Sequence, residues 1–168
     1  MMNLFYLDRD PVIAASYHYD KHKVKMVLEA AQMLCTAHHH WAEVFNYKTF
    51  VHYKKAHYNH PSTIWTRSNK SQYMWVYNYM MALGREYTKR YGKEHLTITK
   101  CKMPLHVPPN GMIDGLFTEP PQCMPDEYKD PSSLIAYWNY YENEKQNIRN
   151  KNEQKITRPS NINELCEH

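Results

Sequence analysis

The sequence predicts a mostly α fold, a compact single domain of three helices with a long proline-rich connection. Three observations support this prediction. Apolar residues recur at three- and four-residue steps in three long segments. Two of these segments follow an Asp-Pro pair, which suits the start of a helix. Most of the prolines gather between residues 93 and 129. We therefore assign residues 1–150 to one mostly helical domain and residues 151–168 to a polar C-terminal tail.

The first helix is expected to begin at Asp10-Pro11 and to continue to about His40. Residues 4–7, which precede it, are apolar and suit either a short strand or an anchor. One face of the helix carries the apolar stripe, namely Val24, Val27, Leu28, Ala31, Leu34 and Cys35. The opposite face carries polar residues and two methionines, namely His22, Lys25, Met26, Glu29, Met33, Thr36 and His40. The pattern predicts that the apolar stripe packs in the core.

Two further helices are expected. The second begins near Ser68 and ends at Gly92, since glycine readily adopts the left-handed conformation that ends a helix. The third begins after Asp130-Pro131, and its apolar stripe includes Trp138. Between them, residues 93–129 are expected to form extended and turn structure on the core. A connection of this length is often functional.

Composition and charge exclude several classes of protein. The formal net charge of +4 permits an anionic partner but falls short of the basic balance of dedicated DNA-binding domains. No apolar segment approaches a membrane-spanning length, and residues 4–7 are too short for a signal peptide. The cysteines form no Cys-x-x-Cys pair, which favours free thiols in a reducing compartment. We therefore expect a cytoplasmic protein, located in the host cell if the chain is viral.

The polar face of the first helix is either an ordinary solvent face or the lining of a groove. At about 100° per residue, Glu29 lies roughly 20° from His22 around the helix axis. Met26 and Met33 lie on the same face, where a solvated helix more often carries Lys or Glu. If the face lines a groove, Glu29 can act as a base or stabilise a cation, while His22 orients it or contacts phosphate.

The motif Asp20-x-His22 followed by Glu29 resembles the first helix of the phage pyrimidine-dimer DNA glycosylases, the endonuclease V family. Residues 60–62 and 82–92 are similar to a Ser-Pro turn and to a later helix end of that family. The chain also resembles an uncharacterised family of phage proteins over residues 4–36, 60–95 and 124–145.

The resemblance implies an all-α DNA repair enzyme, a glycosylase and lyase that acts on damaged or modified bases. Carried over by position, Glu29 stabilises the positive sugar or imine and His22 contacts DNA. In that family the N-terminal amine attacks the deoxyribose. Here the second methionine is too large to favour removal of the first, so we expect the amine of Lys21 or Lys25 to replace it. We expect no metal, no cofactor, no membrane and no obligatory protein partner.

A DNA-binding surface is also indicated by the aromatic and basic residues that alternate between Tyr47 and His60. Lysines meet phosphates, and rings stack on exposed bases. The alternative is a solvated loop whose rings pack inward. The residues expected to contact nucleic acid are Lys21, Lys48, Lys54, Lys55, His60, Trp65, Arg67 and Arg90.

Two other functions stay open. A non-catalytic module that binds a host protein or nucleic acid predicts an exposed Glu29 and no enclosed pocket at His22. A metal-dependent enzyme would combine carboxylates with histidines such as His57 and His60, although no tight ligand motif is present.

Overall fold

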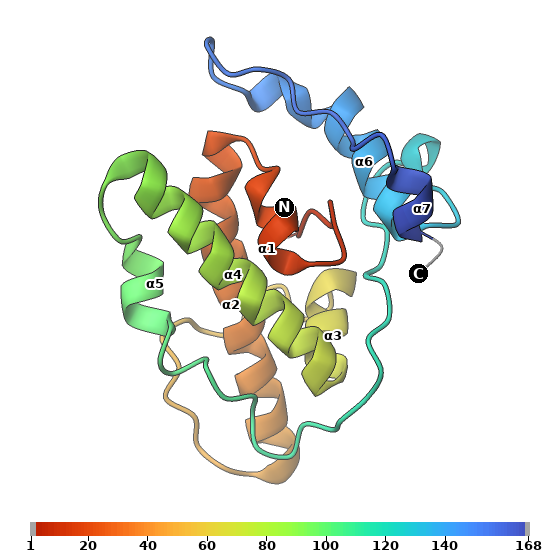
Figure 1. Cartoon of the computed structure of the whole chain (residues 1–168). Helices are drawn as coiled ribbons and strands as arrows, with labels where there is room; N and C mark the ends of the chain where they lie inside the picture. Colours follow the sequence, from red (N-terminus) through yellow and green to blue (C-terminus); the bar gives the residue numbers. More distant parts are fainter. Residues whose placement is uncertain (1–2, 167–168) are drawn as a thin grey trace.

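The computed structural model of the chain describes residues 3–166. Within this range the fold is mostly helical, with seven α-helices, two 3-10 helices and no strand (Figure 1). The three expected helices correspond to α2 (Asp20–Phe45), α4 (Lys70–Tyr91) and α6 (Ser133–Asn143). The shorter elements are α1 (Pro11–Ser16), α3 (Pro61–Ser68), α5 (Leu96–Cys101), η1 (Asp126–Tyr128), η2 (Lys145–Ile148) and α7 (Ile162–Cys166).

The expectation of one continuous helix from Asp10 to about residue 40 is wrong, because the chain turns between α1 and α2. Asp10 caps α1, as its sequence position suggests. The carbonyl of Ala14 then accepts from the amide of Tyr17 and from ring Nδ1 of His18. In a continuous helix the Ala14 carbonyl would instead accept the amide of the residue four positions later. Tyr19 has extended backbone angles, and α2 begins at the next residue.

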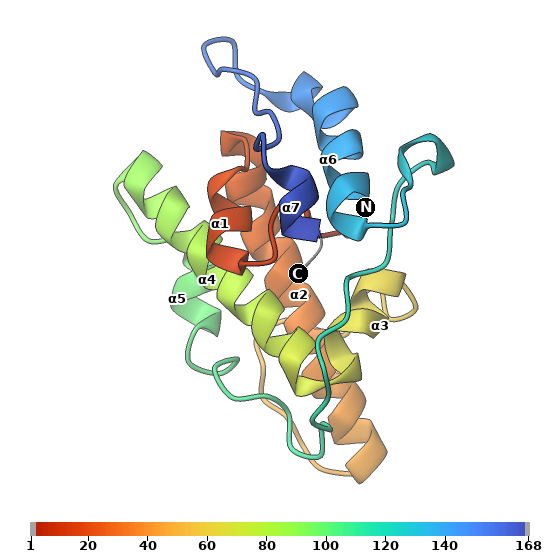
Figure 2. The same cartoon turned by 45° about the vertical axis from the view of Figure 1, so that its right-hand side comes forward.

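Most of the face of α2 that the sequence marks as polar is buried, although Lys25 is exposed. Figures 1 and 2 show α4 crossing α2, and α3 also packs against α2. Met26 and Met33 are 2% and 0% exposed, whereas Val24 and Leu28 are 39% and 36% exposed. The expected burial of Val24 and Leu28 is therefore wrong. The opposite, polar face is buried instead, because α3 and the N-terminal segment, through Phe5, cover it.

Residues 3–7 form a buried, mostly apolar anchor and not a strand. Two of its backbone groups bond to side chains of distant helices. The amide of Phe5 donates to the hydroxyl of Tyr79 in α4. The indole of Trp138 in α6 donates to the carbonyl of Leu7 at 2.9 Å. The anchor therefore links α4 and α6 from inside the fold.

Capping residues fix the ends of α4 and α6. The side chain of Asn69 accepts the amide of Gln72 at the start of α4. Gly92 ends α4 with a φ of 75°, as the sequence predicts. Ser132 caps α6, two positions after Asp130, and the Asp130 carboxylate in turn accepts the Ser132 amide at 3.0 Å. Asp130-Pro131 therefore precedes the helix and supports its cap.

Residues 102–125 contain no helix and pass from α5 around the molecule to η1 and α6 (Figures 1 and 2). Side chains of α3 and α4 hold this segment in place. The indole of Trp65 donates to the carbonyl of Thr118, and the hydroxyl of Ser71 donates to the carbonyl of Gly115.

The C-terminal residues 151–166, polar in sequence, pack on the helical part of the fold. The amide of Ile156 donates to the hydroxyl of Tyr19, and Nε of Arg158 lies 2.8 Å from the carboxylate of Glu142. No helix within the described range is long and apolar enough to cross a membrane.

Candidate functional site

Glu29 of α2 is a buried carboxylate that is only 8% exposed. It forms no hydrogen bond or ion pair with any residue between 3 and 166. Burial raises the pKa of Glu29 above its ordinary value, and the positive charges of Lys25 and Lys145 oppose that shift. An unpaired buried carboxylate costs free energy of folding, so its presence here marks a candidate functional group.

His22 packs against Phe5 of the anchor and against Tyr141 of α6. Its ring centroid is 4.5 Å from that of Phe5, and its Nδ1 is 2.9 Å from the Tyr141 hydroxyl. That hydroxyl accepts the amide of Tyr19, so its own proton goes to Nδ1, and Nε2 carries the imidazole proton. Burial lowers the pKa of His22 to about 2. His22 is therefore uncharged at neutral pH and adds no positive charge to a phosphate contact.

A second histidine–tyrosine pair lies beside the first. Nδ1 of His18 donates to the carbonyl of Ala14, so Nε2 accepts the proton of the Tyr79 hydroxyl at 2.5 Å. The Tyr79 hydroxyl in turn accepts the amide of Phe5. Burial lowers the pKa of His18 to about 3. Both pairs thus repeat one arrangement, in which a tyrosine joins a backbone amide to a neutral histidine.

Lys145 of η2 also belongs to this site. Its Nζ lies 4.7 Å from the ring centroid of Tyr140 and 5.9 Å from that of Phe5. Lys145 is far from Glu29 in sequence, so no local pattern indicates it. The same holds for Tyr79 and Tyr141, whereas His18 is close in sequence but lies before the break that precedes α2. We refer to five of these residues together as the Glu29 cluster, namely His18, His22, Lys25, Glu29 and Lys145.

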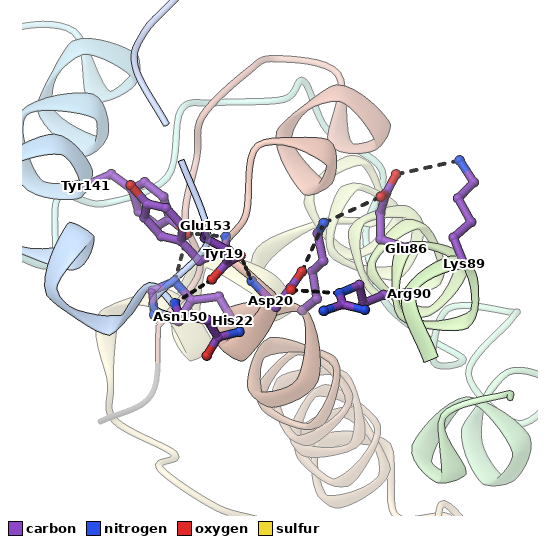
Figure 3. A network of polar contacts seen from close by, with 10 residues as sticks. Tyr19, Asp20, His22, Glu86, Lys89, Arg90, Tyr141, Asn150 and Glu153 are labelled. Atoms are coloured by element: carbon purple, nitrogen blue, oxygen red, sulfur yellow. Dashed lines mark hydrogen bonds and ion pairs between the residues drawn. The ribbon is translucent and has the colours of Figure 1, made fainter. Parts of the chain in front are cut away.

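Asp20, the first residue of the Asp-x-His motif, connects several elements at the start of α2 (Figure 3). Its Oδ2 accepts from Nε of Arg90 at 2.9 Å, and its amide donates to Glu153 at 2.9 Å. Nζ of Lys23 is 3.7 Å from both Asp20 and Glu86. Arg90, expected to contact phosphate, is thus paired with Asp20, although its side chain is 59% exposed.

Three residues expected to contact nucleic acid make contacts inside the protein. Nδ1 of His60 accepts the amide of Ser62 and caps α3. Trp65 is 7% exposed. The guanidinium of Arg67 lies 3.9 Å from the Tyr58 ring centroid, and its Nη1 donates to the Tyr58 carbonyl at 2.6 Å. Trp65 and Arg67 therefore present little surface to a ligand.

The lysines expected on DNA are exposed, but they lie at different distances from Glu29. Lys21 and Lys25 share α2 with it, whereas Lys48 and Lys54 follow the end of that helix. Lys55 forms an ion pair of 2.8 Å with Glu43. Glu43 lies about 21 Å beyond Glu29 along α2, at about 1.5 Å per residue. The structure therefore does not bring Lys48, Lys54 and Lys55 beside the Glu29 cluster.

Bonds to tyrosine also account for the histidine-rich end of α2. Nε2 of His38 is 2.8 Å from the Tyr73 hydroxyl, and Nδ1 of His40 is 2.6 Å from the Tyr58 hydroxyl. Among residues 3–166, no group of three or more His, Cys, Asp or Glu residues is placed to hold a metal ion. The metal-dependent alternative gains no support from this part of the chain.

No protein-family model, curated protein or solved structure matches this chain. The expectation about Met1 and Met2 lies outside the described residues. The basis for a proposed function is therefore the geometry of Glu29 and its neighbours, together with the short motif Asp20-x-His22.

Proposed function

We propose that the protein binds DNA and excises damaged or modified bases, with Glu29 as the carboxylate at the reacting sugar. The observation that carries this proposal is the buried Glu29, which has no hydrogen-bond or ion-pair partner among residues 3–166 and whose pKa is affected by the charges of Lys25 and Lys145. A fixed negative charge in a site of low dielectric stabilises a developing positive charge more strongly than water does. A nucleotide flipped out of the duplex would bring its sugar to this carboxylate.

The proposed reaction needs an amine as well as a carboxylate. A neutral lysine nitrogen forms a bond to C1′ of the deoxyribose while the glycosidic bond breaks and the base leaves with a proton. The nitrogen then loses its proton to the ring oxygen as the sugar ring opens, which leaves an imine. Lys25 and Lys145 are the candidate amines, because both place their charge near Glu29. Lys145 is the more buried of the two.

In the proposed complex, exposed basic residues at both ends of α2 meet the DNA backbone. The distance of about 21 Å from Glu29 to the Lys55–Glu43 pair corresponds to roughly six base pairs at about 3.4 Å each. Ion pairs at the surface are weak, so Lys55 can exchange Glu43 for a phosphate, and the exposed side of Arg90 can meet a phosphate while it stays paired with Asp20. The proposal makes DNA the partner of a single domain, residues 1–150, in the cytoplasm.

The non-catalytic binding module makes the opposite prediction for Glu29, which should then be exposed. The exposed fraction of 8% weighs against that function. The module nevertheless predicts a distinct result in the experiment that tests the proposal.

The experiment uses duplex oligonucleotides that carry a thymine dimer, an abasic site or no lesion. Each is incubated with the protein and borohydride and analysed on a denaturing gel. We expect a lesion-specific covalent adduct that disappears in Glu29→Gln. Mass spectrometry of the trapped peptide then identifies the amine. The matched control is Glu43→Gln, which changes an exposed carboxylate on the same helix and should keep the adduct.

Two results would contradict the proposal. An adduct or nick that persists unchanged in Glu29→Gln would remove the role of this carboxylate. Absence of any adduct and any nick, with DNA binding retained, would support the non-catalytic module.

A further inference from the structure

A recess of about 330 Å³ lies on the other side of the anchor from the Glu29 cluster. It is lined by Tyr6, Arg9, Trp75, Phe117 and Glu119. Phe5 packs on His22, whereas its neighbour Tyr6 packs on Trp75. Consecutive residues of the anchor therefore face the Glu29 cluster and the recess, respectively. The volume is at the lower end of the range for small-molecule sites.

Aromatic rings form one wall of the recess. The ring centroid of Tyr6 is 5.5 Å from that of Trp75 and 6.3 Å from that of Phe117. At these separations the rings touch one another, so a ligand lies against the wall and not between two rings. Phe117 is 37% exposed and therefore offers an open aromatic surface, whereas Trp75 is 6% exposed. Such a wall suits a flat ligand that stacks.

The polar groups of the recess are incompletely paired within residues 3–166. The hydroxyl of Tyr6 is buried and has no hydrogen-bond partner there, although the residue is 0% exposed. A buried hydroxyl without a partner is costly, so it needs an explanation. Oε2 of Glu119 accepts the amide of Ser133 at 2.8 Å, which fixes this carboxylate and leaves Oε1 without a protein partner in the same range.

The charges narrow the class of ligand. Arg9 disfavours a simple cation in the recess, and Glu119 disfavours a simple anion. A neutral ring with N–H donors at its edge satisfies both, because the edge can donate to Glu119 while the face stacks on Phe117. Carboxylates recognise the amino groups of bases in this way. Nη2 of Arg9 donates to the Cys166 carbonyl at 3.0 Å, and its remaining N–H groups are available to a ring oxygen or to a phosphate.

We propose that this recess binds a nucleobase, with Phe117 as the stacking surface and Glu119 as the acceptor at the base edge. The base comes either from a free nucleotide or from an unpaired position in DNA. The proposal does not depend on base excision, because the recess and the Glu29 cluster lie on opposite sides of the anchor.

The test is calorimetric titration of the full chain with each deoxynucleoside 5′-monophosphate and with 1,2-dideoxyribose 5-phosphate, which lacks both a base and the C1′ aldehyde. A second arm uses a single-stranded oligonucleotide and the same oligonucleotide with tetrahydrofuran residues in place of its nucleosides. We expect saturable binding that requires the base and weakens by about tenfold or more in Phe117→Ala and in Glu119→Gln. The matched control is Phe45→Ala, since Phe45 is 55% exposed and lies outside the recess.

Glu29→Gln should leave mononucleotide binding unchanged, because Glu29 does not line the recess. Binding of the mononucleotides identifies a free nucleotide as the source, and binding of the oligonucleotide alone identifies DNA. The proposal is overturned if neither arm shows base-dependent binding, or if Phe117→Ala and Glu119→Gln bind as tightly as the parent chain.

Discussion

The hydroxyl of Tyr141 joins His22 to the amide of Tyr19, at 2.9 Å from each nitrogen. A single oxygen of α6 thereby fixes both the start of α2 and the tautomer of a buried histidine. The same device recurs where Tyr79 joins His18 to the amide of Phe5. Hydrogen-bonded tyrosine–histidine pairs inside the fold thus partly explain why the chain contains fifteen tyrosines and eleven histidines.

Tyr141→Phe should destabilise the protein by about 1–3 kcal/mol, since it leaves Nδ1 of His22 and the amide of Tyr19 buried without a partner. Denaturant-induced unfolding measures the change in the free energy of unfolding. Tyr17→Phe is the control, because the Tyr17 ring packs edge-on against Trp138 at 5.1 Å and its hydroxyl makes no hydrogen bond with residues 3–166. An equal loss in both variants would refute a specific role for the Tyr141 hydroxyl.

Acidification should destabilise the fold from about pH 6.5 downward. Burial lowers the pKa of His18 to about 3, of His22 to about 2 and of His38 to about 4. The unfolded chain binds these protons first, so stability is full above the unfolded pKa and falls towards the folded pKa, by about 1.4 kcal/mol per pH unit for each histidine. Glu29, whose pKa is raised, acts in the opposite sense. Melting temperatures between pH 7.5 and 4.5 test this, and a flat profile would contradict it.

Glu29→Gln should stabilise the fold at pH 7 while removing excision. The substitution replaces a buried carboxylate that has no partner among residues 3–166 by a neutral amide of nearly the same shape, which should raise the free energy of unfolding by about 1–2 kcal/mol. The gain should vanish at low pH, where Glu29 itself is protonated. Glu43→Gln, at an exposed position, should show no gain. A destabilised Glu29→Gln variant would show that the carboxylate has a structural partner.

Gly84→Ala should weaken the contact between α4 and α5. A Cβ built at Gly84 would lie 2.6 Å from Cγ1 of Ile98, so the Ile98 side chain has to move. We expect a loss of about 1–3 kcal/mol, the range for overpacking a filled core. In an Ile98→Ala background the added methyl group has space, so the same substitution should cost less there. Equal costs in both backgrounds would contradict a direct clash.

The sequence predicted the three long helices well, because their apolar stripes and the cap at Gly92 are local features. It did not predict the break before α2, which depends on the ring of His18 bonding to Ala14. It also assigned the polar face of α2 to solvent or a groove. That assignment failed because α2 is central, so neighbouring elements cover it on polar sides as well as on its apolar side. Glu29 was found from spacing and resemblance, whereas Lys145 reaches the site only through tertiary packing.

The anchor also has a consequence for synthesis on the ribosome. The groups that satisfy residues 3–7 include Tyr79 and, much later in the chain, Trp138. Residues 3–7 are synthesised long before these partners, so the nascent chain carries this apolar segment uncovered until α6 has appeared. Contacts of such long sequence separation slow folding and expose the intermediate to aggregation. A nascent chain that stalls before α6 should be a substrate for chaperones and proteases.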